Sequence, residues 1–324
     1  MKTEKLVLAF YYAWYGTPEG PHGKWVHWNH PILARGGVLG YHNPDRVIDG
    51  RRDIAAAEYP LLGPYDSLDP EVIETHLKWA QDYGVDCFIV SWWGREKDED
   101  KVLEKMMNII EEKGYSVKVS AYYETVGLKR DVNEMTDDFK YILEKHAYRE
   151  SFLKIGKRPV IFVYSAEVLE KSFWKIILSY LRSSEIEPFI IGDTRDPAYA
   201  EIFDGIHVYI PLKEAKDSSG TALRRLYSRL KNISRTKGKL FAATVLPGYD
   251  DRVIRIPGNY LPRKRGQVYE LCWKIALEHS PEWIIITSWN EWHEGTEIEP
   301  SKEYGFMYLE FTKKFSEEFK KSGL

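Results

Sequence analysis

The stretch WIIITSWNEW (Trp283–Trp292) is apolar over its first half and ends in the polar residues Asn290 and Glu291. A strand whose two faces are both covered needs apolar side chains at successive positions. Such continuous runs are typical of parallel sheets packed between helices. Polar residues near the carboxyl end of the run indicate where the chain leaves the core. We therefore predict a buried parallel strand over Trp283–Trp292.

Seven earlier runs have the same character and are mostly separated by segments with helical periodicity. Strand and helix alternating eight times predict an α/β fold, in particular a single (β/α)8 TIM barrel. An open doubly wound sheet is the alternative, but no glycine-rich nucleotide-binding loop supports it. The other predicted strands are Leu6–Tyr15, Val85–Trp93, Val117–Glu124, Pro159–Ser165, Phe189–Thr194, Gly205–Pro211 and Leu240–Pro247. The predicted helices are Asp69–Tyr83, Lys101–Lys113, Asn133–Tyr148, Glu167–Leu181, Thr221–Lys237, Gly266–Glu278 and Lys302–Lys321, with at most a short one over Asp196–Phe203.

One connection is unusually long. Residues Gly16–Leu68, after the first predicted strand, are rich in Gly, Pro, Trp and His and show little helical pattern. A segment of this length without regular elements is usually functional or disordered, and this one is too aromatic to be disordered. Because the loops after barrel strands surround the active site, we expect it to form a wall or lid of the pocket. No linker or repeat interrupts the chain, so residues 1–324 are predicted to form one catalytic domain.

The chain of 324 residues has a net charge of −3. So small a net charge favours neither nucleic acid nor a membrane surface as a partner. No stretch approaches the length of a transmembrane helix. The sequence does not begin with a leader and a small-residue cleavage site. We therefore expect a cytoplasmic protein, or an extracytoplasmic one if a leader has been removed. We also expect a monomer that needs no cofactor.

Cysteines and basic residues have simple explanations. Cys87 and Cys272 both lie in apolar segments and are expected to be buried thiols rather than a disulfide. The one dense basic stretch is expected to be a solvated loop. It comprises Arg252, Arg255, Arg263, Lys264 and Arg265.

Aromatic residues make up 14% of the chain, including 11 Trp and 22 Tyr. Barrel active sites lie at the carboxyl ends of the strands, where this sequence places many aromatics, several carboxylates and no lysine. Aromatic faces stack on sugar rings, while tyrosine hydroxyls and indole N–H groups hydrogen-bond sugar hydroxyls. This rim suits a neutral polyhydroxylated ligand better than a phosphate or a nucleic acid. The alternative is that these aromatics only fill a large core.

Glu291 and Glu294 stand three residues apart at the end of the eighth predicted strand. Glycosidic cleavage usually needs two carboxyl groups near one anomeric carbon, one protonated and one ionised. Burial and mutual repulsion separate the two pKa values. We predict that the two glutamates are the catalytic pair. The alternative is that one of them only holds a neighbouring group in place.

His27, His30 and His293 raise the alternative of a metal site. No HExxH motif and no Cys–His set accompanies them. We therefore expect them to act as hydrogen-bonding side chains, and we predict no metal.

The segment SWNEWHEGTEIEP (Ser288–Pro300) resembles the pattern NEWHEGTQIE around the catalytic pair of glycoside hydrolase family 99. The resemblance extends along nearly the whole chain, in the same order. Its other segments are FYYAWYG (Phe10–Gly16), GKWVHWNHPIL (Gly23–Leu33), YPLLGPYDSLDPEVIETHL (Tyr59–Leu77), FDGIHVYI (Phe203–Ile210) and PGYDDRVIRI (Pro247–Ile256).

This resemblance implies an endo-α-1,2-mannosidase or endo-α-1,2-mannanase that cleaves an internal linkage with retention, acting on an oligosaccharide or mannan. It implies that one carboxylate deprotonates the mannose 2-hydroxyl, which attacks C1 to give a 1,2-anhydro sugar. Carried onto this chain, Glu291 is that base, and Glu294 is the general acid and later the base for water. The predicted substrate-binding residues are Tyr15, His27, Trp93, Glu124, Tyr164, Tyr209, Tyr249, Arg255, Asn290, Trp292 and His293.

Some positions depart from the family pattern. Glu297 stands where the pattern has Gln, Glu58 replaces an aromatic, and YYETV surrounds Glu124 where many members read IEPY. The loop after Trp93 is also short. These changes leave the catalytic pair intact but put the outer subsites, and so the glycan, in question. Two alternatives stay open: a glycan-processing enzyme of a neighbouring family that shares the SWNEW strand end, and a catalytically inactive sugar-binding barrel.

Overall fold

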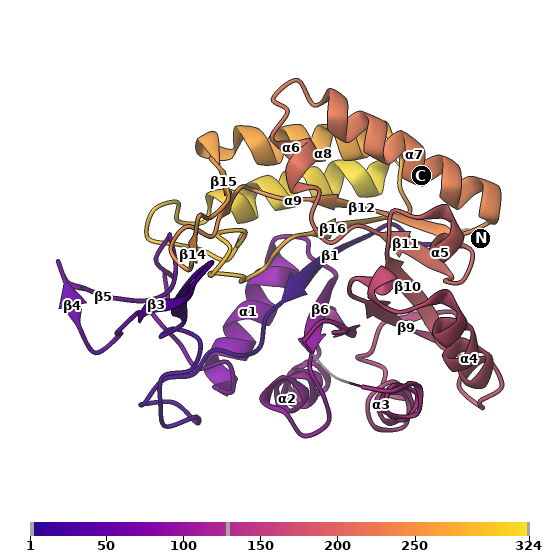
Figure 1. The fold of residues 1–324 in the computed structure, drawn as a ribbon, viewed down its shortest axis with the longest axis horizontal. Helices are drawn as coiled ribbons and strands as arrows, with labels where there is room; N and C mark the ends of the chain where they lie inside the picture. Colours follow the sequence, from indigo (N-terminus) through magenta and orange to yellow (C-terminus); the bar gives the residue numbers. More distant parts are fainter. Residues whose placement is uncertain (1–2, 128–129, 323–324) are drawn as a thin grey trace.

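Eight parallel strands close into a barrel in the computed structural model, which describes residues 3–127 and 130–322 (Figure 1). The strand order is β10-β11-β12-β16-β1-β6-β7-β9, and β10 also pairs with β9, which closes the ring. The predicted (β/α)8 barrel is therefore confirmed. The barrel strands are β1 (Leu6–Tyr11), β6 (Cys87–Trp92), β7 (Lys118–Tyr123), β9 (Arg158–Val163), β10 (Phe189–Asp193), β11 (Gly205–His207), β12 (Leu240–Val245) and β16 (Trp283–Ile286).

Helices surround the barrel (Figure 1), and their starts follow from local capping. The Asp69 side chain accepts a hydrogen bond from the Glu71 amide at the start of α1, and Asp131 and Glu134 form a capping box at α3. The short helix expected over 196–203 shrinks to α5, and α6 was not predicted. The helices are α1 (Pro70–Asp82), α2 (Asp98–Lys113), α3 (Val132–Lys145), α4 (Lys171–Arg182), α5 (Pro197–Ala200), α6 (Leu212–Ala215), α7 (Thr221–Lys237), α8 (Gln267–Glu278) and α9 (Met307–Lys321), with 3-10 turns η1 (Ala166–Val168) and η2 (Lys264–Gly266).

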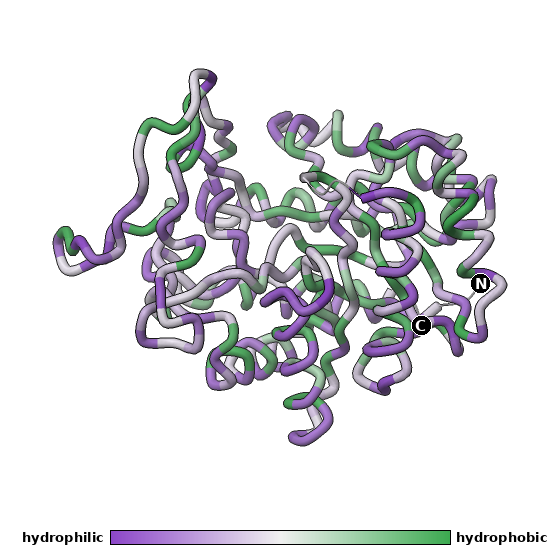
Figure 2. The backbone as a smooth tube through the Cα atoms, turned by 60° about the horizontal axis from the view of Figure 1, so that its bottom comes forward, coloured by the Kyte–Doolittle hydropathy of each residue, from purple (hydrophilic) through white to green (hydrophobic). Residues whose placement is uncertain are grey.

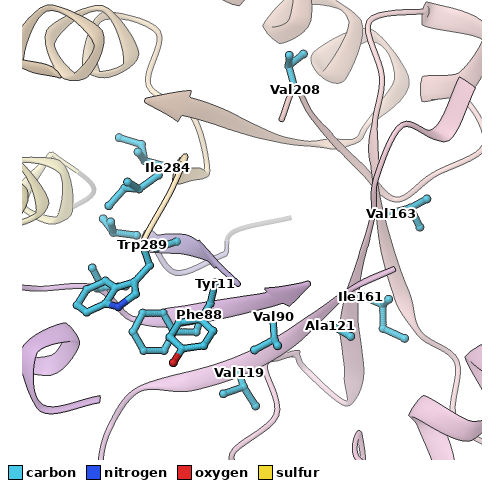
Figure 3. Close-up of a cluster of buried hydrophobic side chains, with 14 of the residues drawn as sticks. Tyr11, Phe88, Val90, Val119, Ala121, Ile161, Val163, Val208, Ile284 and Trp289 are labelled. Atoms are coloured by element: carbon cyan, nitrogen blue, oxygen red, sulfur yellow. The ribbon is translucent and has the colours of Figure 1, made fainter. Parts of the chain in front are cut away.

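Continuous apolar runs occur because each strand is buried on both faces. In β1, Val7 and Ala9 face the layer between strands and helices, whereas Leu8 and Phe10 fill the barrel interior. Figure 3 shows part of the outer layer, with Trp289 against residues of β1 and β6. Burying one such side chain contributes about 1.5–3 kcal/mol. In Figure 2 the hydrophobic stretches accordingly run through the centre of the molecule.

Several predicted strands extend too far at their carboxyl ends. The last barrel strand ends at Ile286 rather than Trp292, and the sixth ends at His207 rather than Pro211. Trp289 and Trp292 are fully buried although they lie in a loop. The apolar run therefore continues past the last hydrogen bond of the strand ladder. Glu291 and Glu294 follow the strand instead of belonging to it.

The long segment 16–68 contributes strands to two small sheets, one formed by β2 and β3 with β14 and the other by β4 and β5. Strand β2 pairs in parallel with β14, which follows β12, so the segment is tied to the loop at the carboxyl end of the seventh barrel strand. The Trp28 indole donates to the Tyr65 carbonyl at 2.8 Å, which joins the two ends of the segment. The remaining strands are β2 (Pro31–Ala34), β3 (Gly37–Tyr41), β4 (Val47–Ile48), β5 (Arg51–Arg52), β8 (Lys154–Ile155), β13 (Tyr249–Asp250), β14 (Arg255–Ile256) and β15 (Tyr260–Leu261).

Two expectations from composition can be compared with the structure. Cys87 and Cys272 are buried free thiols, as predicted. Over residues 3–127 and 130–322, none of the helices combines the length and apolar character that crossing a bilayer requires.

A buried carboxylate holds the end of the second barrel strand. Asp100, on α2, is 1% exposed and accepts hydrogen bonds from Trp92 Nε1 at 2.9 Å, Tyr141 Oη at 2.6 Å and His146 Nε2 at 2.7 Å. The amide of Glu96 donates to it as well, at 3.0 Å. Asp100 therefore joins β6, α2 and α3 at the point where Trp93 enters the pocket rim.

Replacing Asp100 tests how much these buried hydrogen bonds stabilise the fold. Asp100→Ala leaves several buried donors without an acceptor, so we expect the free energy of unfolding to fall by about 3 kcal/mol. The control is Asp137→Ala, because among the described residues Asp137 pairs with Lys140 at the surface, and such a pair contributes less than about 1 kcal/mol. Denaturant unfolding of both variants gives the comparison. Equal losses would show that the buried network contributes nothing beyond a surface pair.

Candidate active site

A pocket opens at the carboxyl ends of the barrel strands, where β1, β6, β7, β9, β11 and the loops after β12 and β16 meet. The segment 16–68 supplies His27 and His30 to its wall, as expected for a loop after the first strand. The lining residues are Tyr12, Trp14, His27, His30, Trp93, Glu124, Val126, Tyr164, Tyr209, Ile254, Arg255, Glu291, His293 and Glu294.

Another cavity of about 300 Å³ lies at the opposite, amino-terminal end of the strands. It is lined by the basic side chains Lys231, Arg235 and Lys239 together with Asp204 and Glu282. Phe189 and Phe241 are the aromatic residues that reach it. We place the candidate active site at the carboxyl end, since barrel enzymes carry their chemistry there.

Nine predicted site residues line the pocket: His27, Trp93, Glu124, Tyr164, Tyr209, Arg255, Glu291, His293 and Glu294. Four others, Tyr15, Tyr249, Asn290 and Trp292, are buried behind it. The prediction omitted the lining residues Tyr12, Trp14, His30, Val126 and Ile254. Tyr12 and Trp14 stand in the aromatic run that follows β1, where their position at a strand end was a usable signal.

The residues behind the pocket tie β1 to the loop that carries the glutamates. Asn290 accepts from the Tyr12 amide at 2.7 Å and donates to the Tyr12 carbonyl at 2.9 Å. The Tyr15 hydroxyl donates to the Asn290 carbonyl at 3.2 Å and accepts from the Trp292 amide at 3.1 Å. These residues therefore position the backbone on both sides of Glu291, and they are not among the residues that line the cavity.

A second layer lies further below and was not predicted. Glu299 is fully buried and accepts from the Tyr65 hydroxyl at 2.8 Å and from the Trp292 indole at 3.1 Å. His76, on α1, lies 3.2 Å from the same carboxyl group. Glu299 therefore joins the first helix, the end of the long segment and the loop after β16, which carries Glu291 and Glu294.

Glu291 is held by short local contacts. Its amide donates to Ser288 Oγ at 2.8 Å, and its Oε1 accepts from the His293 amide at 3.1 Å. The side chain is only 5% exposed. Burial, reinforced by the charge of Glu294, raises the pKa of Glu291 well above its usual range.

Glu294 faces a cation. Arg255 Nη1 lies 3.2 Å from Glu294 Oε1 and 2.9 Å from Asp251 Oδ2. Burial raises the pKa of Glu294, while Arg255 and the Tyr249 hydroxyl oppose that rise. The guanidinium therefore favours a charged Glu294, whereas burial and the charge of Glu294 favour a neutral Glu291.

The histidines form a stack. The ring of Trp14 lies 4.6 Å from that of His27 at an interplanar angle of 6°, and His293 lies 5.5 Å from His27 and 4.7 Å from His30. Burial, with the charge of His30, lowers the pKa of His27 to about 4, and burial lowers that of His293 well below its usual range. Both rings are neutral at neutral pH. Within the described residues, no cluster of three or more His, Cys, Asp or Glu has the arrangement of a metal site.

His27 has a left-handed backbone, with φ of 59°. A non-glycine residue in this region carries strain on the order of 1–2 kcal/mol. His293 Nε2 lies 3.0 Å from the His27 carbonyl. This contact links the strained residue to the loop after β16. Such strain is common at functional sites.

Glu124 lies across the pocket from the pair. It accepts from Ser91 Oγ at 2.7 Å, and Ser91 in turn accepts from the Trp93 indole at 2.9 Å. Burial, with the nearby charge of Asp193, raises the pKa of Glu124 to about 8. At neutral pH it is therefore mostly protonated and can donate a hydrogen bond to a neutral ligand.

One expectation about a charged residue is wrong. Arg263 was expected in a solvated loop but is 5% exposed. Glu58 and Glu297, two departures from the family pattern, do not line the pocket and instead flank Arg263. Sequence composition shows that a stretch is basic, but not which of its side chains turns inward.

Paired carboxylates among aromatic residues at the carboxyl end of a (β/α)8 barrel define a glycosidase-type active site. The chain belongs to glycosyl hydrolase family 99, whose model matches residues 2–321. It is 31% identical to the glycoprotein endo-alpha-1,2-mannosidase of Mus musculus, over 97% of this chain and 74% of the mouse protein. It is 32% identical to that of Xenopus laevis, over 96% and 76%.

A solved structure agrees with these similarities. The endo-alpha-mannosidase of this family from Bacteroides thetaiotaomicron superimposes with a TM-score of 0.84 at 27% identity, covering 98% of each chain. The protein is therefore an endo-acting glycoside hydrolase. Membership of this family rules out one alternative that the sequence left open, the neighbouring family that shares the SWNEW strand end.

The buried carboxyl of Glu124 predicts a pH-dependent stability. Its folded pKa of about 8 exceeds that of an unfolded glutamate, about 4.3. The protonated group therefore stabilises the fold at low pH, and this contribution is lost as pH rises through both values. Gln does not titrate, so the free energy of unfolding of Glu124→Gln should rise relative to that of the unchanged protein as pH increases from 5 to 8. The expected slope of this difference is at most about 1.4 kcal/mol per pH unit. Denaturant unfolding at several pH values measures it.

The control is Glu112→Gln, which changes an exposed glutamate on α2. We expect its stability difference from the unchanged protein to be the same at every pH tested. If the stability difference between Glu124→Gln and the unchanged protein is also independent of pH, the pKa of Glu124 is not raised by folding.

Proposed function

We propose that residues 1–324 form one catalytic domain that hydrolyses an internal α-1,2-mannosidic bond with retention, in two steps through a 1,2-anhydro sugar. The names of the mouse and frog relatives support the linkage. The observation that carries the proposal is the pair Glu291 and Glu294, the first buried and the second partly buried, which both line one pocket. The substrate is an oligosaccharide or a mannan.

In the first step, ionised Glu291 takes the proton of the mannose 2-hydroxyl. The freed oxygen attacks C1, the bond from C1 to the leaving oxygen breaks, and Glu294 gives its proton to that oxygen. The sugar becomes a 1,2-anhydro ring, and neither glutamate forms a bond to carbon. Glu291 is now protonated and Glu294 ionised.

In the second step, Glu294 takes a proton from water as the water oxygen attacks C1. The bond between C1 and O2 opens, and Glu291 returns its proton to O2. Each step inverts C1, so the product retains the configuration of the substrate. Both glutamates return to their starting protonation states, as a catalytic cycle requires.

Substrate binding must move the proton of the pair. Without sugar, Arg255 favours ionised Glu294, whereas the first step needs Glu294 protonated and Glu291 ionised. A sugar 2-hydroxyl that donates to Glu291 stabilises its charged form, and a leaving oxygen that accepts from Glu294 stabilises its neutral form. Arg255 retains Asp251 as a partner when this exchange occurs.

The rest of the pocket suits a neutral sugar. His27 and His293 are uncharged, and Trp14 and Trp93 offer flat apolar faces. The hydroxyls of Tyr12 and Tyr209 lie 2.5 Å apart beside the pair. No unpaired cation attracts a phosphate within the lining, since Arg255 already contacts two carboxylates.

Substitution of each glutamate separates the two roles. Glu294→Gln should lose about 10²–10⁴-fold in kcat on substrates with poor leaving groups, because no proton reaches the departing oxygen. An activated aryl leaving group needs no such proton and should be partly spared. Glu291→Gln should fail on both, since an amide does not take the 2-hydroxyl proton. Binding of sugar should survive in both variants, because Gln retains the volume and one acceptor.

The mannose 2-hydroxyl itself provides an independent check. A matched 2-deoxy substrate should be inert with the unchanged enzyme, and the released sugar should first appear as the α anomer by NMR. Hydrolysis of the 2-deoxy substrate at a near-normal rate would rule out participation by that hydroxyl. Release of the β anomer would instead rule out retention.

A further inference from the structure

Arg263, in the loop before α8, lies beneath the catalytic loop and is almost completely buried. Its Nη1 donates to the Glu297 carbonyl at 2.8 Å, and its Nη2 donates to the Gly295 carbonyl at 3.3 Å and to the Glu297 side chain. The rings of Tyr304 and Tyr308 lie 5.4 and 4.8 Å from its guanidinium carbon. One side chain therefore holds two backbone carbonyls, those of Gly295 and Glu297, in the segment that follows Glu294.

The backbone of Glu294 is held on the opposite side as well. Its carbonyl accepts from the Asp250 amide at 2.7 Å. Gly295 has φ of 57°, and a Cβ added there would meet the backbone nitrogen of Asp250 at 3.0 Å. The peptide after Glu294 is thus enclosed between β13 and Arg263. Without Arg263, the Gly295 carbonyl would lose its donor and the turn could relax on one side.

Two carboxylates share this one buried cation. Glu297 comes from the catalytic loop, and Glu58 comes from the segment 16–68, with its Oε1 3.2 Å from Arg263 Nε. Each carboxylate also has a buried oxygen, Oε2, that meets no hydrogen-bond partner among the described residues. Burial raises the pKa of both groups, against the effect of Arg263. One carboxylate is enough to neutralise the guanidinium, so the second is in excess.

We propose that Arg263 is a positioning residue for Glu294, and that Glu58 and Glu297 are interchangeable counter-ions that retain the guanidinium under the catalytic loop. The inference rests on the proposed role of Glu294 as the general acid. It also gives a reason for the two departures from the family pattern, because both departures place a carboxylate on the same arginine.

Positioning has a kinetic consequence that a purely structural role lacks. A misplaced general acid slows departure of a poor leaving group more than departure of an activated one. Arg263→Lys retains the charge but loses the fork that reaches two carbonyls. We expect it to lower kcat about 10–100-fold on a mannoside with a sugar leaving group, less on an activated aryl mannoside, and to leave KM within about threefold.

The control is Arg225→Gln, which removes an exposed arginine from α7 on the outside of the barrel. It should retain the kinetics of the unchanged enzyme on both substrates. Near-UV circular dichroism at the assay temperature shows that each variant is folded. Equal losses on both leaving groups for Arg263→Lys, or a rise in KM alone, would overturn the positioning role.

The counter-ions are tested by a double-mutant cycle. Glu58→Gln and Glu297→Gln should each retain kcat within about threefold, because the other carboxylate still neutralises Arg263. The double variant leaves a buried unpaired cation, and it should show the same leaving-group-dependent loss as Arg263→Lys. Additive small losses, or full activity in the double variant, would overturn the interchangeable roles.

Glu294→Gln, assayed in parallel, separates this inference from the proposed function. If Glu294→Gln shows the leaving-group dependence and Arg263→Lys does not, the inference fails and the acid role stands. If Glu294→Gln loses equally on both substrates, the acid role fails, and with it the inference that depends on it.

Discussion

Closure of the parallel sheet is the constraint on which the rest of the structure depends. Because β10 pairs with both β9 and β11, the ring has no free edge among its eight strands. Parallel strands in a closed ring must all end at the same mouth. Tyr12, after the first strand, and Asn290, after the last, therefore meet through two hydrogen bonds. The pocket forms because the loops that follow these strands all leave the same end of the barrel.

Desolvation is the second physical theme, because the pocket places several ionisable groups away from water. A buried charge is costly unless it is paired and hydrogen-bonded. Three sets of contacts offset the desolvation of charged groups around the loop after β16. They are Arg255 with Asp251, Arg263 with two glutamates, and Glu299 with tyrosine and tryptophan donors. Glu291 and Glu124 lack a strong cationic partner, and their pKa values rise. The same burial that raises a pKa thus makes a carboxyl available as a proton carrier near neutral pH.

Local features were predictable, because residues that are close in the sequence are also close in space. Glu291 and Glu294 had to be neighbours wherever the chain ran, and the aromatic composition of the strand ends indicated a sugar pocket before any fold was known. The strand limits were less predictable. Trp289 and Trp292 continue an apolar run beyond the last ladder hydrogen bond, because a buried loop needs the same residues as a buried strand. The stack that brings Trp14 and His30 against His293 was not predictable, because it joins residues of separate loops.

The sequence by itself determined the alternation of buried strands and amphipathic helices, the pair of glutamates and the family to which the chain belongs. These depend on periodicity and on motifs read within a few residues. Only the tertiary structure decided that Arg263 turns inward to hold the loop after Glu294, that Glu58 reaches it from more than 200 positions away, and how burial shifts the pKa of each carboxyl. Contacts between distant residues arise from chain closure. Ionisation depends on how much water each group loses and which charges surround it, and neither quantity exists until the chain has folded.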